Sequence, residues 1–254
     1  MKRNRTISKI LVPIAGAVIL TTASNAAVLA QYNFTGNVNT TSDVDVNSTA
    51  SNLGIGLGVL PLLGNQFGTF DNSGGHFFST GGITNIGSAN ATSPHRFVRS
   101  TNTTATAAGA IANSDYFKFT LTPNATFLVN LTDLFFDYSG TGNSTVFNTS
   151  TFFVRSSADG FAADVGTTVS AGQNAGNSNF RRQTISLTGS SFQNLTAPIT
   201  FHIYVMNSIT ATNDGVARLD NITLNGAIAP IPEPSSLALV GSLGVLALLR
   251  RRRA

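Results

Sequence analysis

The sequence predicts an all-β protein, a jelly-roll-like two-sheet β-sandwich flanked by an N-terminal signal peptide and a short C-terminal hydrophobic helix. Short segments of alternating apolar and polar residues, bounded by Gly, Asn, Asp and Ser, are typical of strands and turns. Charged residues make up 10% of the 254 residues, against about 25% in an average soluble domain. This leaves too few Glu, Lys and Arg to cover the solvent faces of a helical bundle. The absence of Cys excludes disulfides, thiolate metal sites and thiol nucleophiles.

Residues 1–30 have the three parts of a secretory signal peptide. The positive charges of the basic part are Lys2, Arg3, Arg5 and Lys9. The apolar run 10–20 spans about 16 Å as a helix, well short of the ~30 Å hydrocarbon core that a membrane anchor would cross. Val28-Leu29-Ala30 resembles an A-x-A cleavage site, which makes Gln31 the first residue of the exported form. A cut after Ala26 or Ala27 remains open as an alternative.

Residues 31–230 are expected to form one domain, because no linker or charge run divides them. In 116–121, Phe117, Phe119 and Leu121 share one face while polar residues and Tyr116 share the other. The same pattern predicts strands at 31–35, 67–70, 76–80, 95–99, 127–131, 134–138, 151–156, 166–170, 181–188, 201–206 and 221–225. Residues 55–63 are expected to be a packed loop or edge strand, and 100–114 an exposed loop. No helix is expected between the two ends.

The net charge of +4 comes from the two ends of the chain. Residues 31–232 carry seven Lys and Arg side chains against ten Asp and no Glu. The domain is therefore weakly acidic and has no basic stripe, which argues against a nucleic-acid partner.

The sequence gives little support for catalysis. The single Glu, Glu233, lies in the tail, so a Glu-based acid/base pair is absent. Most Asp residues lie beside Gly, Asn or Ser, where Asp commonly caps turns. The histidines, His76, His95 and His202, lack the spacing of a local metal pair, and no G-x-S-x-G motif is present. We therefore expect no enzymatic activity and no cofactor.

A calcium site is one alternative at the N-terminal part of the domain. Asp43, Asp45 and Asn47 match the opening of a D-x-D-x-N loop. Ser48 then replaces the required Gly, which excludes an EF-hand. A structural Ca²⁺ held by Asp43 and Asp45, with Asp220, remains an alternative to a simple polar turn.

Glycan binding is a second alternative. Sugar sites commonly stack sugars on exposed aromatic rings, and the aromatic residues with a polar group are Tyr32, Tyr116, Tyr138 and Tyr204. The lack of Trp weakens this interpretation, and the tyrosines can instead line the sheets or the core.

The last residues, 231–254, have three parts in a fixed order. Pro232-Glu233-Pro234 precedes Ser235-Ser236, an apolar run follows from Leu237 to Leu249, and the chain closes on the cluster Arg250, Arg251, Arg252 and Arg253. Arginines after an apolar run hold that end on the cytoplasmic side. The tail resembles the PEP-CTERM sorting signal of exported bacterial proteins. The resemblance implies transient insertion in the inner membrane and cleavage at or near Pro-Glu-Pro by an exosortase, a membrane-embedded cysteine transpeptidase. Such proteins come from bacteria that produce extracellular polysaccharide and biofilm.

Three segments of the domain are similar to bacterial secreted jelly-roll domains of the carbohydrate-binding-module kind. They are Tyr32-Asn33-Phe34, residues 115–121 and Arg218-Leu219-Asp220-Asn221-Ile222. The similarity concerns a strand pattern and identifies no binding site.

Together these features predict an exported protein of the cell surface or extracellular matrix with a non-enzymatic, structural or adhesive role. A lectin resembling a carbohydrate-binding module is the alternative, with extracellular polysaccharide as its partner. A secreted hydrolase is disfavoured by the missing Glu and the scattered histidines.

Overall fold

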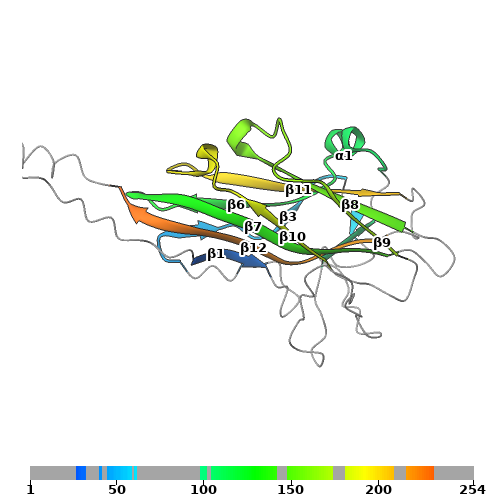
Figure 1. Ribbon diagram of the computed structural model, residues 1–254, viewed down its shortest axis with the longest axis horizontal. Helices are drawn as coiled ribbons and strands as arrows, with labels where there is room; N and C mark the ends of the chain where they lie inside the picture. Colours follow the sequence, from blue (N-terminus) through cyan, green and yellow to red (C-terminus); the bar gives the residue numbers. More distant parts are fainter. Residues whose placement is uncertain are drawn as a thin grey trace, which may run out of the picture.

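The computed structural model describes residues 27–32, 40–41, 45–58, 60–61, 98–101, 104–141, 148–173, 181–208 and 216–231. These residues form two antiparallel sheets that pack face to face (Figure 1). Sheet A has the order β10 (Arg181–Ser186), β7 (Phe127–Thr141), β12 (Val216–Pro230), β5 (Val98–Thr101) and β4 (Leu60–Pro61), and β1 (Ala27–Tyr32) also pairs with β12. Sheet B has the order β2 (Ser48–Ala50), β6 (Tyr116–Pro123), β11 (Ile199–Asn207), β8 (Asn148–Ser156) and β9 (Val169–Gln173), and β3 (Gly54–Ile55) also pairs with β6. The predicted all-β sandwich is confirmed.

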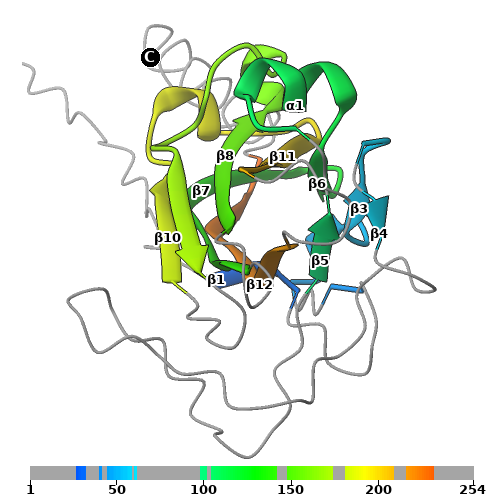
Figure 2. The ribbon, with the colours of Figure 1, turned by 90° about the vertical axis from the view of Figure 1, so that its right-hand side faces the viewer.

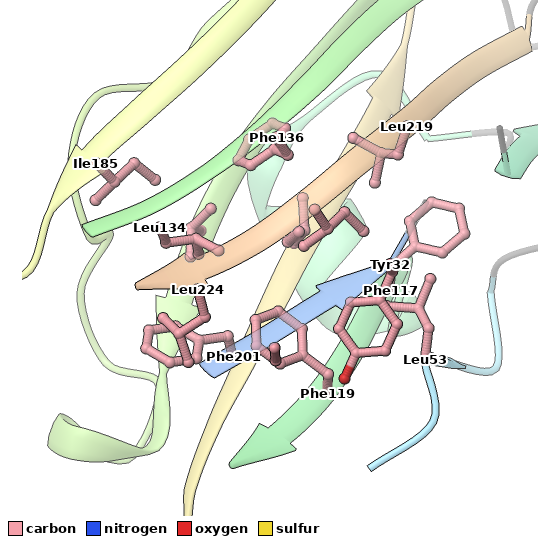
Figure 3. Close-up of a cluster of buried hydrophobic side chains, with 14 of the residues drawn as sticks. Tyr32, Leu53, Phe117, Phe119, Leu134, Phe136, Ile185, Phe201, Leu219 and Leu224 are labelled. Atoms are coloured by element: carbon pink, nitrogen blue, oxygen red, sulfur yellow. The ribbon is translucent and has the colours of Figure 1, made fainter. Parts of the chain in front are cut away.

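The core lies between the sheets and follows from the alternation in the sequence. Along β6 the buried positions alternate with more exposed ones, so that Phe117, Phe119 and Leu121 point inward. Figure 3 shows Phe117 and Phe119 in the same buried cluster as side chains of sheet A, including Leu134, Phe136, Leu219 and Leu224. Phenylalanine fills much of this core, as the composition predicts. Burying one such side chain stabilises a fold by about 1.5–3 kcal/mol.

Among the described residues, the predicted strands fall on observed strands, with two differences in sheet A and one in sheet B, where the strand predicted at 166–170 is shifted to β9 (Val169–Gln173). The predicted strands 127–131 and 134–138 are one continuous strand, β7, because β12 pairs with it along its whole length. The strand predicted at 31–35 begins earlier, at Ala27, so the predicted boundary of the signal peptide after Ala30 falls inside β1. The strand candidates 67–70 and 76–80 lie outside the described residues, as do residues 1–26 and 232–254.

The expectation of no helix in the domain is wrong for α1 (Ala107–Asn113), which lies in the predicted exposed loop. The side chain of Thr106 accepts a hydrogen bond from the Gly109 amide at 3.2 Å and caps the helix. Ser114 ends it in a left-handed conformation. The helix covers part of the outer face of sheet B (Figure 2), where Ala110 packs with Phe153 and Tyr204. Two 3₁₀ turns complete the fold, η1 (Ser157–Asp159) and η2 (Ser190–Phe192).

Candidate functional site

Alternation in sheet B places a second set of side chains on its outer face. Tyr116 and Lys118 of β6, His202 and Tyr204 of β11, and Arg155 of β8 point away from the core. The register places His202 directly between Lys118 and Arg155. The adjacent row contains Tyr116, Tyr204 and Phe153. We call Tyr116, Phe153, Phe161, His202 and Tyr204 the outer aromatic cluster.

His202 lies between two aromatic rings. Its ring centroid is 3.8 Å from that of Tyr116 and 4.1 Å from that of Phe161, with interplanar angles of 11° and 13°. Both faces of the imidazole are therefore occupied within the protein. All three rings of the stack, Tyr116, His202 and Phe161, are half-buried, so the stack is partly open to solvent.

The segment after η1 holds Phe161 over His202. The Phe161 amide donates to the Ser156 carbonyl at 2.8 Å, and its own carbonyl accepts from Arg155 at 3.0 Å. Arg155 also pairs with Asp164 at 2.9 Å. Phe161 adopts a positive φ of 63°, which these contacts maintain. The stack is thus fixed by the fold.

The surroundings of His202 keep its imidazole neutral. Burial, and secondarily the positive charge of Lys118, lower the pKa of His202 from 6.5 to about 4. Its Nδ1 atom is buried and meets no hydrogen-bond partner among the described residues. A neutral, sandwiched histidine is suited to packing and is poorly placed for proton transfer to a ligand.

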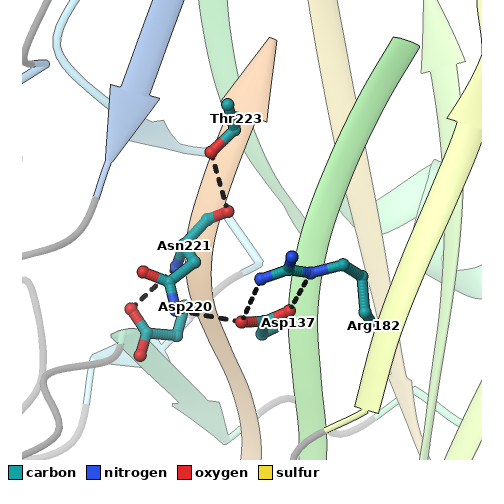
Figure 4. A network of polar contacts seen from close by, with 5 residues as sticks. All are labelled: Asp137, Arg182, Asp220, Asn221 and Thr223. Carbon is teal, nitrogen blue, oxygen red and sulfur yellow. Dashed lines mark hydrogen bonds and ion pairs between the residues drawn. The ribbon is translucent and has the colours of Figure 1, made fainter. Parts of the chain in front are cut away.

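A polar cluster lies on the outer face of sheet A (Figure 4). Arg182 of β10 donates to Asp137 of β7 through Nε at 2.8 Å and Nη2 at 3.0 Å. Asn221 of β12 donates to the same carboxylate at 2.9 Å. Asn221 reaches it because the register shifts between Asp220 and Thr223, where Asn221 takes a left-handed conformation with φ of 48°. This cluster therefore links three strands.

The carboxylate of Asp220 lies next to this cluster, on the residue paired with Asp137 across β12 and β7. Burial raises the pKa of Asp220 well above its usual value, the hydrogen bond from the Asn221 amide lowers it, and the Asp137 charge raises it further. Two facing carboxylates with one raised pKa resemble an acid/base pair. Both oxygens of Asp137 already accept hydrogen bonds from Arg182 and Asn221, however, so this carboxylate is committed to holding the strands together.

The tyrosines predicted to contact glycans fall into two groups. Tyr32 and Tyr138 lie in the core, and the Tyr32 hydroxyl donates to the Ser51 carbonyl. Tyr204 is buried beneath α1, with its ring stacked on Phe153 at 4.7 Å. Burial removes these three rings from contact with a sugar. Tyr116 alone of the four is partly exposed.

The residues predicted for calcium lie on different sheets. Asp45 precedes β2 of sheet B and caps the turn by accepting from the Asn47 amide at 2.8 Å. Asp220 belongs to β12 of sheet A, and Asp43 lies outside the described residues. Within the described part of the chain, no three His, Cys, Asp or Glu side chains are grouped so as to hold a metal. The calcium site stays a prediction that nothing in this part of the chain supports.

The domain ends immediately before the predicted sorting motif. β12 extends to Pro230, and the Ile231 amide donates to the Thr126 carbonyl at 2.7 Å. The predicted processing residues lie outside the described residues, namely Pro232, Glu233, Pro234, Ser235, Arg250, Arg251, Arg252 and Arg253. The described residues contain no helix long and apolar enough to cross a membrane.

Comparison with known proteins confirms the motif. Residues 230–253 match the model of the PEP-CTERM protein-sorting motif. The chain therefore carries the signal of an exported protein that an exosortase sorts. A search of curated proteins found no match.

Among solved structures, the chain is similar to one described as an exo-beta-agarase. The likeness has a TM-score of 0.29 and 12% identity, and it covers 80% of this chain and 25% of the agarase chain. The chain thus spans about a quarter of that protein. A likeness of this extent assigns no activity.

Proposed function

We propose that the protein is a non-enzymatic component of the cell surface or extracellular matrix of a polysaccharide-producing bacterium, with a structural or adhesive role. In this proposal the chain passes the inner membrane, and an exosortase processes its tail at or near Pro232-Glu233-Pro234. The observation that carries the proposal is the direct junction between β12 and the sorting motif. The sorting signal follows the sandwich directly, because β12 reaches Pro230 and the match to the motif begins there.

The described polar clusters support a structural role. Asp137 is saturated by Arg182 and Asn221, and His202 is neutral and covered on both faces. These are the groups on the outer faces of the two sheets that most resemble catalytic candidates. Each serves instead to fix strands or loops in place.

The sorting part is tested by expressing the full chain in a host that has an exosortase. We expect released or surface-bound protein to lack Arg250–Arg253 in its intact mass. Replacing Pro232, Glu233 and Pro234 together with Ala is expected to leave the full-length tail and retain the protein in the membrane fraction. Lys118→Ala, at an exposed site on the domain, serves as the control and is expected to be processed normally. Released wild-type protein with its arginine cluster intact would contradict the proposal.

A lectin is the second candidate, and the partly exposed Tyr116, two residues from exposed Lys118 on the outer face of β6, favours it. Affinity electrophoresis of the exported form through gels containing the host's exopolysaccharide, with and without Ca²⁺, separates the two roles. Unchanged mobility supports the structural role. Retardation that Tyr116→Ala abolishes, and that exposed Thr122→Ala leaves intact, supports the lectin.

A further inference from the structure

The first strand of the sheet includes residues that the A-x-A-like site at Val28-Leu29-Ala30 would remove. Leu29, Ala30 and Tyr32 are fully buried members of the main core. The backbone of β1 pairs with β12, with Ala30 opposite Leu224 and Tyr32 opposite Ile222. β1 (blue) lies along β12 (orange) in Figure 1. A cut after Ala30 would take two of these three core residues from the exported protein.

Leu29 fits a specific space in β12. The register of β1 shifts between Val28 and Ala30, and this irregularity turns Leu29 as well as Ala30 into the core. A Cβ atom at Gly226 would lie 2.7 Å from Leu29 Cδ1, closer than carbon atoms approach. The absence of a side chain at position 226 thus makes room for Leu29. The domain is built to include this residue.

The residues on the N-terminal side of Leu29 do not share its burial. Ala27 is exposed, and Val28 is 37% exposed. In the sequence, Ser24 and Ala26 place small residues at the third and first positions before the Ala26–Ala27 bond, the pattern required for removal of a leader. Cleavage after Ala27 would place the larger Asn25 at the third position.

We propose that the leader is removed by hydrolysis of the Ala26–Ala27 peptide bond, so that the exported protein begins at Ala27 and retains β1. Water adds across this bond, giving a carboxylate on Ala26 and an amino group on Ala27. The proposal rests on the proposed function in one respect, because it requires export.

The fold places this new N-terminus toward the end of β12 that precedes the sorting motif. β1 runs antiparallel to β12, and Ala27 pairs with Gly226, close to the end of β12 at Pro230. Ala27 and Pro230 therefore lie toward the same end of β12.

The test is N-terminal sequencing and intact-mass measurement of the exported full-length chain. Two variants separate the cleavage sites: Ala26→Gln enlarges the residue before the proposed bond, and Val28→Gln enlarges the third residue before the alternative bond after Ala30. We expect wild type and Val28→Gln to begin at Ala27, and Ala26→Gln to accumulate as uncleaved precursor, with at least a tenfold loss of processed protein.

An exported protein that begins at Gln31, or a block by Val28→Gln with normal processing of Ala26→Gln, would overturn the proposal. Failure of export is distinguishable from both results. In that case wild type and both variants alike remain in the cell with the leader attached, and the proposed function fails together with this inference.

Discussion

Arg182 and Asp137 form a two-point contact on the outer face of sheet A, with Nε to Oδ1 at 2.8 Å and Nη2 to Oδ2 at 3.0 Å. Asp137 is buried, whereas the Arg182 side chain is 29% exposed. The guanidinium of Arg182 also lies 4.3 Å from the Phe135 ring centroid. This arrangement uses the planar fork of arginine, which lysine lacks.

Arg182→Met is expected to lower the free energy of unfolding by about 2 kcal/mol, because it leaves the buried carboxylate of Asp137 without its cation. This loss is smaller than for a fully buried ion pair, because the Arg182 side chain is partly exposed. Arg182→Lys is expected to lower the free energy of unfolding by about half as much, because lysine keeps the charge and lacks the planar fork. Urea denaturation measures both. Lys118→Met, at an exposed position of β6, is the control. Equal losses for the two Met variants would show that the ion pair has no special role.

Asp220 is predicted to reduce stability at neutral pH. Its pKa is raised in the folded state, so the folded chain holds a proton that the unfolded chain releases as the pH rises above 3.8. The folded state therefore loses stability from pH 3.8 up to the raised pKa. Asp220→Asn cannot ionise and keeps an oxygen for the Asn221 amide.

The variant is expected to match wild type below pH 3.8 and to be more stable than wild type at pH 7. Denaturant unfolding at a series of pH values measures the difference. Asp159→Asn is the control: Asp159 is exposed, its two carboxylate oxygens accept from the Ala162 and Ala163 amides, and Asn keeps only one of these bonds, so this variant should lose stability at pH 7 where Asp220→Asn gains it. A stability gain of Asp220→Asn that does not change with pH would contradict the view that the gain comes from removing an ionisable group.

The strands of this fold are visible in the sequence because burial alternates with period two. The inward residues of β6 and β11 repeat at every second position, so the local sequence of each segment alone predicts a strand. Helix α1 was missed because the segment 107–110 consists of Ala and Gly alone, without a periodic face of large apolar residues. Its position depends on contact between Ala110 and the rings of Phe153 and Tyr204, which are distant in sequence.

The polar cluster of sheet A could not be predicted for a similar reason. Arg182 lies 45 positions from Asp137, and Asn221 lies 84 positions from it. No local spacing connects them, and the left-handed Asn221 at the register shift determines which side chain reaches the carboxylate. The stack on His202 likewise depends on Phe161, which comes from a loop. The sorting motif, by contrast, is a contiguous signal and was identified from its residues alone.

His202 is predicted to make the domain less stable as the solution becomes acidic. The unfolded chain takes up a proton near pH 6.5, whereas folded His202 stays neutral until the pH reaches about 4. The contribution of neutral His202 to the free energy of unfolding is therefore present above pH 6.5 and is lost as the pH falls toward 4. Because the ring is partly exposed, we expect a loss of about 1–2 kcal/mol over this range, less than the full pKa difference implies.

His202→Phe tests this dependence while keeping an aromatic ring between Tyr116 and Phe161. Unfolding free energies measured from pH 7 to pH 4 should fall less steeply for the variant than for wild type. Lys118→Gln should reduce the slope only in part, since the charge of Lys118 is the smaller cause of the lowered pKa. Identical slopes for wild type and His202→Phe would contradict the prediction.

Gly226→Ala tests the fit between β1 and β12. The added Cβ would lie 2.6 Å from the Asn130 carbonyl oxygen and 2.7 Å from Leu29 Cδ1, so one strand has to shift. We expect a loss of about 1–3 kcal/mol in unfolding free energy, in the range of overpacked cores. Gly189→Ala is the matched control, because nothing lies within 4 Å of a Cβ there, and it should change stability by less than about 0.5 kcal/mol.

The two contacts of position 226 can be separated by adding Leu29→Ala. Alone, Leu29→Ala should cost about 2–4 kcal/mol, because it leaves a cavity in the core. In the double variant the clash with Leu29 is gone, so the combined loss should be smaller than the sum of the single losses. Exactly additive losses would mean that Leu29 does not occupy the space beside Gly226 in the exported protein. That result would also favour an exported chain in which β1 is missing.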